Sequence, residues 1–339
     1  MASIREIAKL AGVSTGTTSF VLNGKGDQMR ISPSTQQKVL EAAKALNYRP
    51  NISARHLRSS GGKAVPVVAI LWTLDTRASL IGRFLKGIEN LISNQTREFE
   101  LLIQPYENSK INKVESLITG TRFNGAVIAY TSEEDLTFLE NNQINVPIVL
   151  YQRESSKYSS IKVDFLNSGK KVADLFAQRG HKNVGIIVPD LASQSIYQRR
   201  DGFMNGAAIH NLYVDPKHVV IGSNTGEGGY NAVKELLKRK ELPTAVFFIN
   251  DTMAAGGLAA FHEAGVKIPD DIEVMSHDNH DHTRFTIPSL STVHLPEEEM
   301  AAACMNTLLD VIENKVEDPV SLTFETTQII RQSCGGFKQ

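Results

Sequence analysis

Residues 1–46 carry hydrophobic positions at helical spacing, separated by residues that start and stop helices. A capping box, Ser3 with Glu6, predicts the start of a first helix, and Gly12 predicts its end. Ser14 is the expected cap of a second helix, and Ser32-Pro33 opens a third. The expected apolar positions are Ile7, Ala8, Ala11, Val21, Leu22, Val39, Leu40, Ala43 and Leu46. Helix, glycine turn and helix predict a helix-turn-helix domain.

From residue 65 onward, apolar runs of strand length alternate with amphipathic stretches. The expected strands are VPVVAILW, FELLI, GAVIAY, VPIVLY, NVGIIV, TAVFFI and DIEVMS. The expected helices are 83–95, 112–119, 166–179, 199–211, 230–239, 252–264 and 297–309. This alternation favours an α/β body with doubly wound parallel sheets. The stretch is too long for one core, so we expect two lobes with a ligand cleft at the carboxyl ends of the strands.

The charge of the chain is unevenly distributed, which its net charge of −1 conceals. Residues 1–63 contain ten Lys and Arg against three Asp and Glu, for +7, and the remainder carries −8. A basic head on an acidic body is typical of nucleic-acid binding, although charge alone fits DNA, RNA or an anionic membrane. Small polar residues open the second helix where base edges would be met, namely Thr15, Gly16, Thr17 and Ser19. In an unrelated three-helix module the same residues would only be solvated.

Composition indicates a reducing compartment. The chain has two cysteines, Cys304 and Cys334, which excludes a disulfide framework. Its start lacks the apolar core of a secretory signal, and no apolar run reaches membrane-spanning length. We therefore expect a cytoplasmic, nucleoid-associated protein that makes no membrane contact.

Catalytic and metal-binding patterns are weak along the body. The glycine-rich stretch 222–229 matches no phosphate-loop spacing, so we expect a strand-to-helix turn with Asn224 facing the cleft. His277-Asp-Asn-His-Asp-His282 fits no standard zinc spacing. Following the strand DIEVMS, Asp278 is expected to face ligand hydroxyls while the histidines are solvated. We expect no metal, no cofactor and no enzymatic activity, with Cys304 as core packing and His181 as a helix-stop residue.

Three segments of the head resemble those of a known protein family. AKLAGVSTGTTSFVLNGKG, ISPSTQQKVLEAAKALNYRPN and ARHLR together resemble the LacI/GalR family of bacterial transcription regulators. The resemblance implies a helix-turn-helix DNA-binding domain over 1–47, a hinge helix and linker over 48–63, and a two-lobed, periplasmic-binding-protein-like effector and dimerisation domain over 64–339. It also implies a homodimer on a pseudo-palindromic double-stranded DNA operator. Leu57 would wedge into a central minor-groove base step and kink the DNA.

The resemblance and the helix-turn-helix reading together supply a set of expected DNA contacts. They are Ser14, Thr15, Gly16, Thr17, Ser19, Phe20, Asn23, Arg30, Ser32, Asn51, Ala54, Arg55 and Leu57. Phe20 stands where many members have an arginine, and Gly16 offers no side chain at a position that usually carries specificity. The loop 24–31 is also longer than usual and brings Arg30 near the DNA. We therefore expect contacts unlike those of the best-known members.

The body resembles the effector domain of the same family. The motifs on which this resemblance rests are Arg199-Arg-Asp-Gly202-Phe203, Asn250-Asp251-Thr252-Met253-Ala254, PDDIEVMSHDN and PSLSTVHLP. The implied ligand contacts are Asp75, Leu80, Ile81, Ser195, Arg199, Asn224, Asn250, Thr252 and Asp278. Fork donors, carboxylate acceptors and small hydroxyls suit a carbohydrate.

The expected function is that of a repressor controlled by a small ligand, with a sugar or sugar derivative as the first candidate. A non-sugar metabolite or a protein co-regulator is the alternative. A sugar-binding protein without DNA function is disfavoured by the basic head. The usual aromatic platform is missing at 77–81, which points to a more polar ligand: acidic, phosphorylated, or larger than a simple hexose.

Overall fold

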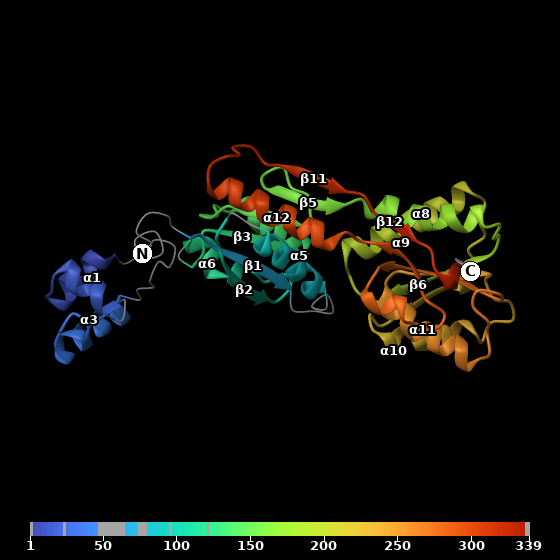
Figure 1. Ribbon diagram of the computed structural model, residues 1–339, viewed down its shortest axis with the longest axis horizontal. Helices are drawn as coiled ribbons and strands as arrows, with labels where there is room; N and C mark the ends of the chain where they lie inside the picture. Colours follow the sequence, from blue (N-terminus) through green and yellow to red (C-terminus); the bar gives the residue numbers. More distant parts are fainter. Residues whose placement is uncertain are drawn as a thin grey trace.

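The computed structural model describes residues 3–22, 25–46, 65–73, 80–94, 97–120 and 122–335. A helical head, a first lobe and a second lobe follow one another along the long axis (Figure 1). The expected boundaries at 47–48 and 63–64, and with them the expected hinge helix, lie outside the described residues.

The head consists of α1 (Ile4–Ala11), α2 (Thr15–Leu22) and α3 (Pro33–Ala45). The predicted caps are present: Ser3 and Glu6 form the capping box, and Gly12 ends α1 at φ +67°. Ile7, Val21 and Val39 lie at the centre of a small core. The prediction for Leu40 was wrong, because α1 and α2 cover the neighbouring face of α3 and leave this side chain 49% exposed.

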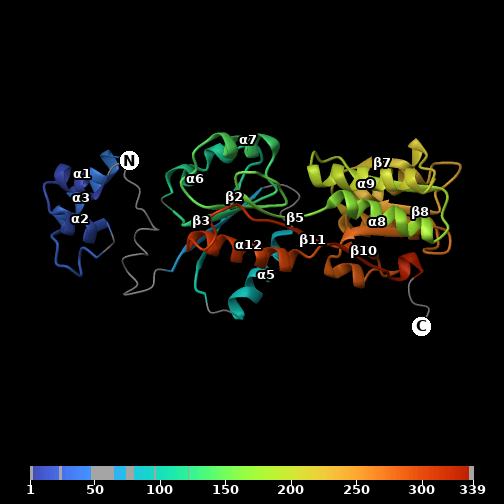
Figure 2. The same ribbon diagram turned by 90° about the horizontal axis from the view of Figure 1, so that it is seen from above.

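The first lobe is built on a parallel sheet with the strand order β11-β5-β4-β3-β1-β2. Its strands are β1 (Val67–Thr73), β2 (Glu100–Tyr106), β3 (Gly125–Ala129), β4 (Ile148–Tyr151), β5 (Ser159–Val163) and β11 (Ser321–Phe324). Its helical elements are α5 (Ile81–Ser93), η2 (Ile111–Lys113), α6 (Glu115–Thr119), α7 (Glu133–Asn141) and α12 (Glu297–Ile312). Seen from above, α5 and α12 cover one face of the sheet while α6 and α7 cover the other (Figure 2).

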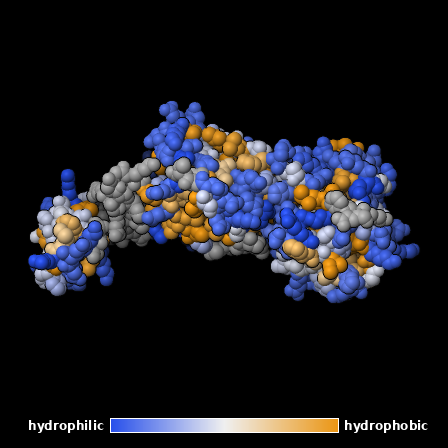
Figure 3. Space-filling view, viewed as in Figure 1, coloured by the Kyte–Doolittle hydropathy of each residue, from blue (hydrophilic) through white to orange (hydrophobic). Residues whose placement is uncertain are grey.

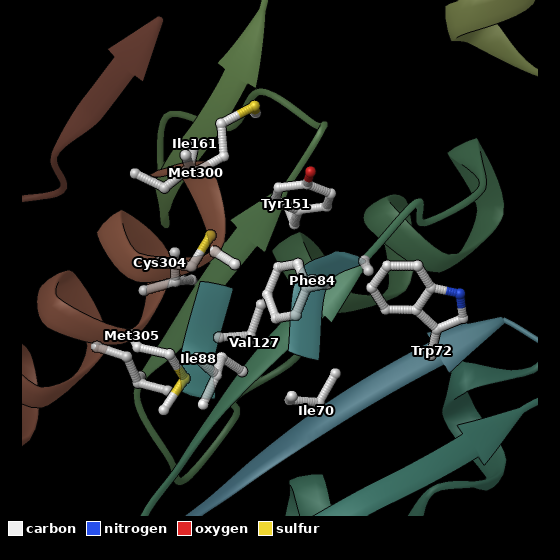
Figure 4. Packing of buried hydrophobic residues seen from close by; sticks show 14 of the residues in the cluster. Ile70, Trp72, Phe84, Ile88, Val127, Tyr151, Ile161, Met300, Cys304 and Met305 are labelled. Carbon is white, nitrogen blue, oxygen red and sulfur yellow. The ribbon is translucent and has the colours of Figure 1, made fainter. Parts of the chain in front are cut away.

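Strand β1 shows why both faces are covered. Alternate side chains point to opposite sides of a strand. Val68, Ile70 and Trp72 accordingly belong to the core under α5 and α12, whereas Val67, Ala69 and Leu71 belong to the core under α6 and α7. Figure 4 shows the first of these cores, where Phe84 of α5 and Cys304 of α12 meet the sheet. Cys304 is fully buried, as its helical position predicted.

The second lobe contains a six-stranded sheet with the order β12-β10-β9-β8-β6-β7. Its strands are β6 (Val184–Pro189), β7 (Val219–Gly222), β8 (Ala245–Phe248), β9 (Glu273–Asp278), β10 (Ser291–His294) and β12 (Thr327–Ile329). Its helical elements are α8 (Phe165–Gln178), α9 (Gln194–Ile209), η3 (Pro216–His218), α10 (Gly226–Leu236), α11 (Asp251–Glu263), η4 (Asp281–Arg284) and η5 (Gln332–Cys334). Helices α8 and α9 cover one face and α10 and α11 the other (Figure 1).

The two predicted doubly wound sheets are confirmed, with one exception in direction. β12 pairs antiparallel with β10, while the other strands of the second sheet run parallel. The chain crosses between the lobes three times, after β5, β10 and β11. The predicted helix 112–119 is broken into η2 and α6. The sequence reading missed β5, β7, β10, β11, β12 and α7.

Candidate functional site

The start of α2 presents an exposed surface of small and polar residues. Ser14 caps this helix by accepting the Thr17 backbone N–H at 3.0 Å, and Thr18 and Val21 anchor its inner side. The predicted contacts then divide by exposure. Ser14, Thr15, Gly16 and Phe20 are exposed, whereas Thr17 and Ser19 are partly buried. The outer face is thus small and polar at its start and aromatic near its end.

The long loop before α3 is held in a defined position by Gln36, a residue that the sequence reading missed. Its amide Nε2 donates to Asp27 Oδ1 and to the Ile31 carbonyl, both at 2.8 Å. Arg30 is exposed in this loop at φ +54°, and Ser32 caps α3 by accepting the Thr35 N–H at 3.3 Å. The loop therefore holds Arg30 on the exposed surface of the head, between α2 and α3. Asn23, Asn51, Ala54, Arg55 and Leu57 lie outside the described residues.

A cavity of about 340 Å³ lies between the two lobes. The first lobe contributes Leu80 and Tyr130, and the second lobe supplies the remaining wall. The lining residues of the second lobe are Leu191, Ser193, Ser195, Ile196, Arg199, Asn224, Thr225, Gly226, Asn250, Thr252, Asp278 and His280. The volume suits a small molecule.

Most of the expected ligand contacts meet in this cavity. Leu80, Ser195, Arg199, Asn224, Asn250, Thr252 and Asp278 all line it. Ile81 does not: it is the first residue of α5 and packs against the first-lobe core. Asp75 lies outside the described residues. The sequence reading missed Tyr130, Ser193, Thr225 and His280, although Thr225 could have been found as the cap of α10.

Arg199 and Asp278 form a buried ion pair at the floor of the cavity. Arg199 Nη1 lies 3.1 Å from Asp278 Oδ1 and donates to the Ile249 carbonyl at 3.1 Å. The guanidinium also stacks over the Phe165 ring, 4.6 Å from its centroid. Burial by itself would raise the pKa of Asp278, but the charge of Arg199 and the hydrogen bond from His277 hold it well below its usual range. Asp278 therefore enters the cavity as a carboxylate.

His277 is fully buried, so the expectation that it is solvated was wrong. β9 continues through His277, whose ring lies 2.6 Å from Ser168 Oγ and 2.9 Å from Asp278 Oδ1. Burial and the charge of Arg199 lower the pKa of His277 to about 4. A neutral ring with its proton on Nδ1 donates to Asp278 and accepts from Ser168. The residue thus orients Asp278.

Asp251 holds the chain that follows β9 against the start of α11. Its buried carboxylate accepts from Ser276 Oγ, Thr292 Oγ1 and the backbone N–H of His280. Burial and the nearby charge of Asp278 raise the pKa of Asp251 to about 7. These bonds fix the position of His280 at the cavity wall.

Arg83 of the first lobe reaches across to the end of β9 and to the crossover after β10. It donates to the carbonyls of Asp278 (2.7 Å) and Leu295 (2.8 Å) and pairs with Glu298 at 2.8 Å. Its partners lie about two hundred residues away in sequence, so no local pattern could reveal them. The link connects the lobe that joins the head to the strand that carries Asp278.

Glu297 is a buried acid beside this link. Its carboxylate accepts from Tyr130 Oη at 3.2 Å and lies 3.7 Å from Arg83 Nη1. Burial raises the pKa of Glu297 to about 8, and the nearby charge of Asp278 adds to this rise. Arg83 lowers the pKa only in part, because its charge is shared with Glu298. Glu297 is therefore mostly protonated at neutral pH.

This protonation predicts a pH-dependent stability. The folded protein binds a proton at Glu297 that the unfolded chain loses above its ordinary pKa of 4.5, so stability falls as pH rises from about 4.5 to about 8. Glu297→Gln is expected to flatten this fall and to be at least about 1 kcal/mol more stable than the parent at pH 8. Glu299→Gln, at an exposed position on the same turn, is the control. Chemical unfolding between pH 5 and 9 measures the effect, and parallel curves for parent and Glu297→Gln would contradict it.

The described residues offer neither a metal site nor a membrane-spanning helix. No group of three or more His, Cys, Asp or Glu side chains is placed there to hold a metal ion. None of the described helices combines the length and apolar character needed to cross a membrane.

Comparison with known proteins matches the two parts of the chain to two family models. Residues 3–51 match the lacI family of bacterial regulatory proteins, and residues 173–334 match a periplasmic binding protein-like domain. Among curated relatives, the HTH-type transcriptional repressor PurR of Photorhabdus laumondii is 30% identical over 340 residues, covering 98% of this chain and 97% of that protein. The probable HTH-type transcriptional repressor ExuR of Bacillus subtilis is 29% identical and covers 98% of each chain.

Solved structures agree. A LacI family transcription regulator from Clostridium acetobutylicum superposes with a TM-score of 0.76 at 30% identity, over 78% of this chain and 99% of that one. The Lac repressor dimer bound to operator gives 0.71 at 21% identity, over 98% and 99%, which shows a common fold. The capped helix-turn-helix, the two-lobed body and the relatives thus lead to one conclusion. The chain belongs to the LacI family of bacterial regulatory proteins and is a DNA-binding transcriptional regulator.

Proposed function

We propose that this protein is a homodimeric repressor whose operator affinity is set by a small hydroxylated ligand, a sugar or sugar derivative, in the cavity between the lobes. The observation that carries the proposal is the Arg199–Asp278 pair, which faces a cavity of about 340 Å³ among serine, threonine and asparagine side chains. Fork donors and carboxylate acceptors at one wall match adjacent hydroxyl groups.

The wall favours a polyol over a flat heteroaromatic ligand. Among the described residues that line the cavity, Tyr130 and His280 are the only ring side chains. Tyr130 is 5% exposed and packs edge-on against Trp72 and Tyr151, so it offers little open ring face. Several curated relatives are transcriptional repressors named PurR, and one neighbouring structure is a complex of the regulator CelR with cellobiose. A purine is therefore the competing outcome of the test.

Ligand binding would change the operator affinity of the head through the first lobe. Arg83 links the end of β9 to α5 and α12, and the first lobe leads to residues 48–63, the proposed hinge. Hydrophobic residues reach the visible surface of the first lobe (Figure 3), and Ile92 and Ile103 are exposed apolar side chains of this lobe. A second copy of the chain would cover such a surface. The dimer would then set two α2 helices in adjacent major grooves, with Leu57 wedged in the minor groove between them.

The test is operator binding by the full-length protein, measured by fluorescence anisotropy on a pseudo-palindromic site from its own upstream region. We expect a member of a panel of sugars and sugar derivatives to change operator affinity at least about tenfold, and Asn224→Ala to reduce that response without changing affinity in its absence. Asn224 lines the cavity and belongs to the second lobe, which the first lobe separates from the head (Figure 1). A response to hypoxanthine or guanine alone would refute the sugar class.

A further inference from the structure

Three helices of the second lobe begin at the wall of the cavity. Ser193, Thr225 and Asn250 are the N-cap residues of α9, α10 and α11, and all three line the cavity. The helices are 16, 11 and 13 residues long. Each N-terminus carries the equivalent of about half a positive charge. Three such partial charges therefore lie at one wall of the cavity.

The start of α9 is not closed by its own cap. Thr225 and Asn250 each accept a first-turn backbone N–H of their helix, at 3.0 and 2.9 Å. The Ser193 side chain makes no such bond and instead lies 3.0 Å from Ser195 Oγ. The N–H groups in the first turn of α9 are therefore left for another acceptor.

Arg199, the sixth residue of α9, adds an independent feature. Arg199 is 6% exposed and lines the cavity, and its Nε is buried without a hydrogen-bond partner. Its Nη1 is already engaged with Asp278 and the Ile249 carbonyl. Buried donors in native proteins are nearly always satisfied, so an orphan on a cavity wall points to an acceptor brought by a ligand.

The charges of the wall limit what that acceptor can be. Arg199 and Asp278 neutralise one another, and no lysine stands among the described lining residues. Burial lowers the pKa of His280, which keeps this ring neutral at neutral pH. What remains is the positive field of the three helix ends, together about +1.5 charges, which is enough for one carboxylate but falls short of a phosphate dianion.

We infer that the effector carries one carboxylate, which binds at the start of α9 between Ser193, Ser195 and Arg199. The inference rests on the proposed function, because the same molecule supplies the hydroxyl groups for Asp278 and the asparagines. The ligand class is then a sugar acid, distinct from both a neutral sugar and a sugar phosphate.

Calorimetric titration of the full-length protein tests the inference. The panel is D-glucuronate, D-galacturonate and D-gluconate, each beside its neutral parent sugar and the corresponding 6-phosphate. We expect at least one acid to bind about tenfold or more tightly than its parent and its phosphate. Equal or tighter binding of a neutral sugar or a phosphate would overturn the carboxylate while leaving the proposed function standing. Binding of hypoxanthine with no binding by any sugar compound would overturn both.

A matched pair of variants at Ser193 locates the carboxylate. Aspartate and asparagine are both good N-caps, so both variants are expected to fold, and Ser193→Asp should raise the thermal midpoint. The aspartate would occupy the start of α9 with its own charge and weaken acid binding about tenfold or more. Ser193→Asn, neutral and of similar shape, should retain most of the acid affinity. Undiminished acid binding by Ser193→Asp would refute the placement.

Discussion

Arg199→Met is expected to lower the stability of the second lobe by about 3–5 kcal/mol and to abolish the response to effector. The substitution leaves Asp278 ionised, 5% exposed and without its cation, and an uncompensated buried charge is costly. Methionine retains much of the side-chain volume over the Phe165 ring, so the loss reports the charge more than a cavity. Urea unfolding measures the stability, and calorimetric titration measures the response.

Two further variants separate the charge effect from a general disturbance of α9. Arg200 is the adjacent residue, part-exposed and paired with Asp201, so Arg200→Met is expected to change stability by no more than about 0.5 kcal/mol. The double variant Arg199→Met/Asp278→Asn removes both charges and should recover part of the lost stability. Asparagine is chosen because position 278 has φ +111°, where alanine would be strained. A double variant no more stable than Arg199→Met would show that the pair is not the source of the effect.

Gly202→Ala is expected to lower the thermal midpoint of the second lobe by roughly 6–12 °C, the equivalent of about 3 kcal/mol. Helices α8 and α9 approach so closely here that a Cβ on Gly202 would lie 1.9 Å from the Leu166 carbonyl oxygen. Backbone on the facing helix cannot move aside as a flexible side chain can, so the helices must separate. Since α9 also carries Ser193 and Arg199, the variant should bind effector less well. Differential scanning calorimetry gives the midpoint.

Gly82→Ala provides the matched control. Gly82 also lies within a helix, α5, but nothing lies within 4 Å of the position its Cβ would take. The same substitution should therefore stabilise the protein by up to about 1 kcal/mol through helix propensity. If both variants shifted the midpoint in the same direction by similar amounts, the close approach of α8 and α9 would not explain the loss at Gly202.

Local signals predicted the helix ends of the head because the causes of those ends lie within four residues. The Ser3–Glu6 capping box, the Gly12 stop and the Ser14 and Ser32 caps all occur where the sequence placed them. Buried central strands were also predictable, since a strand covered on both faces must be apolar at nearly every position. β1, fully buried along its length, is the clearest example.

Elements whose character depends on a distant partner were missed or misjudged. β12 is three residues long and begins with two polar residues, and only its pairing with β10 makes it a strand. His277 looked like a loop histidine, yet β9 carries it inward against Ser168 of α8. The family resemblance predicted seven of the residues that line the cavity, because it assigns contacts position by position. It did not indicate Ser193 or Arg83, whose roles depend on how α9 and α5 are placed.

Short-range patterns were enough to predict the helix-turn-helix head, the alternation of strands and helices and the family, because each follows from residues close together or from motifs read in order. Only the folded arrangement set the electrostatics of the cavity between the lobes. Arg83, Arg199 and Asp278 come from α5, α9 and β9, and their charges interact strongly because burial reduces the screening by water. The same burial keeps Glu297 of α12 mostly protonated. These elements are far apart in the chain and meet only in the folded body, so no single segment could have revealed their interactions.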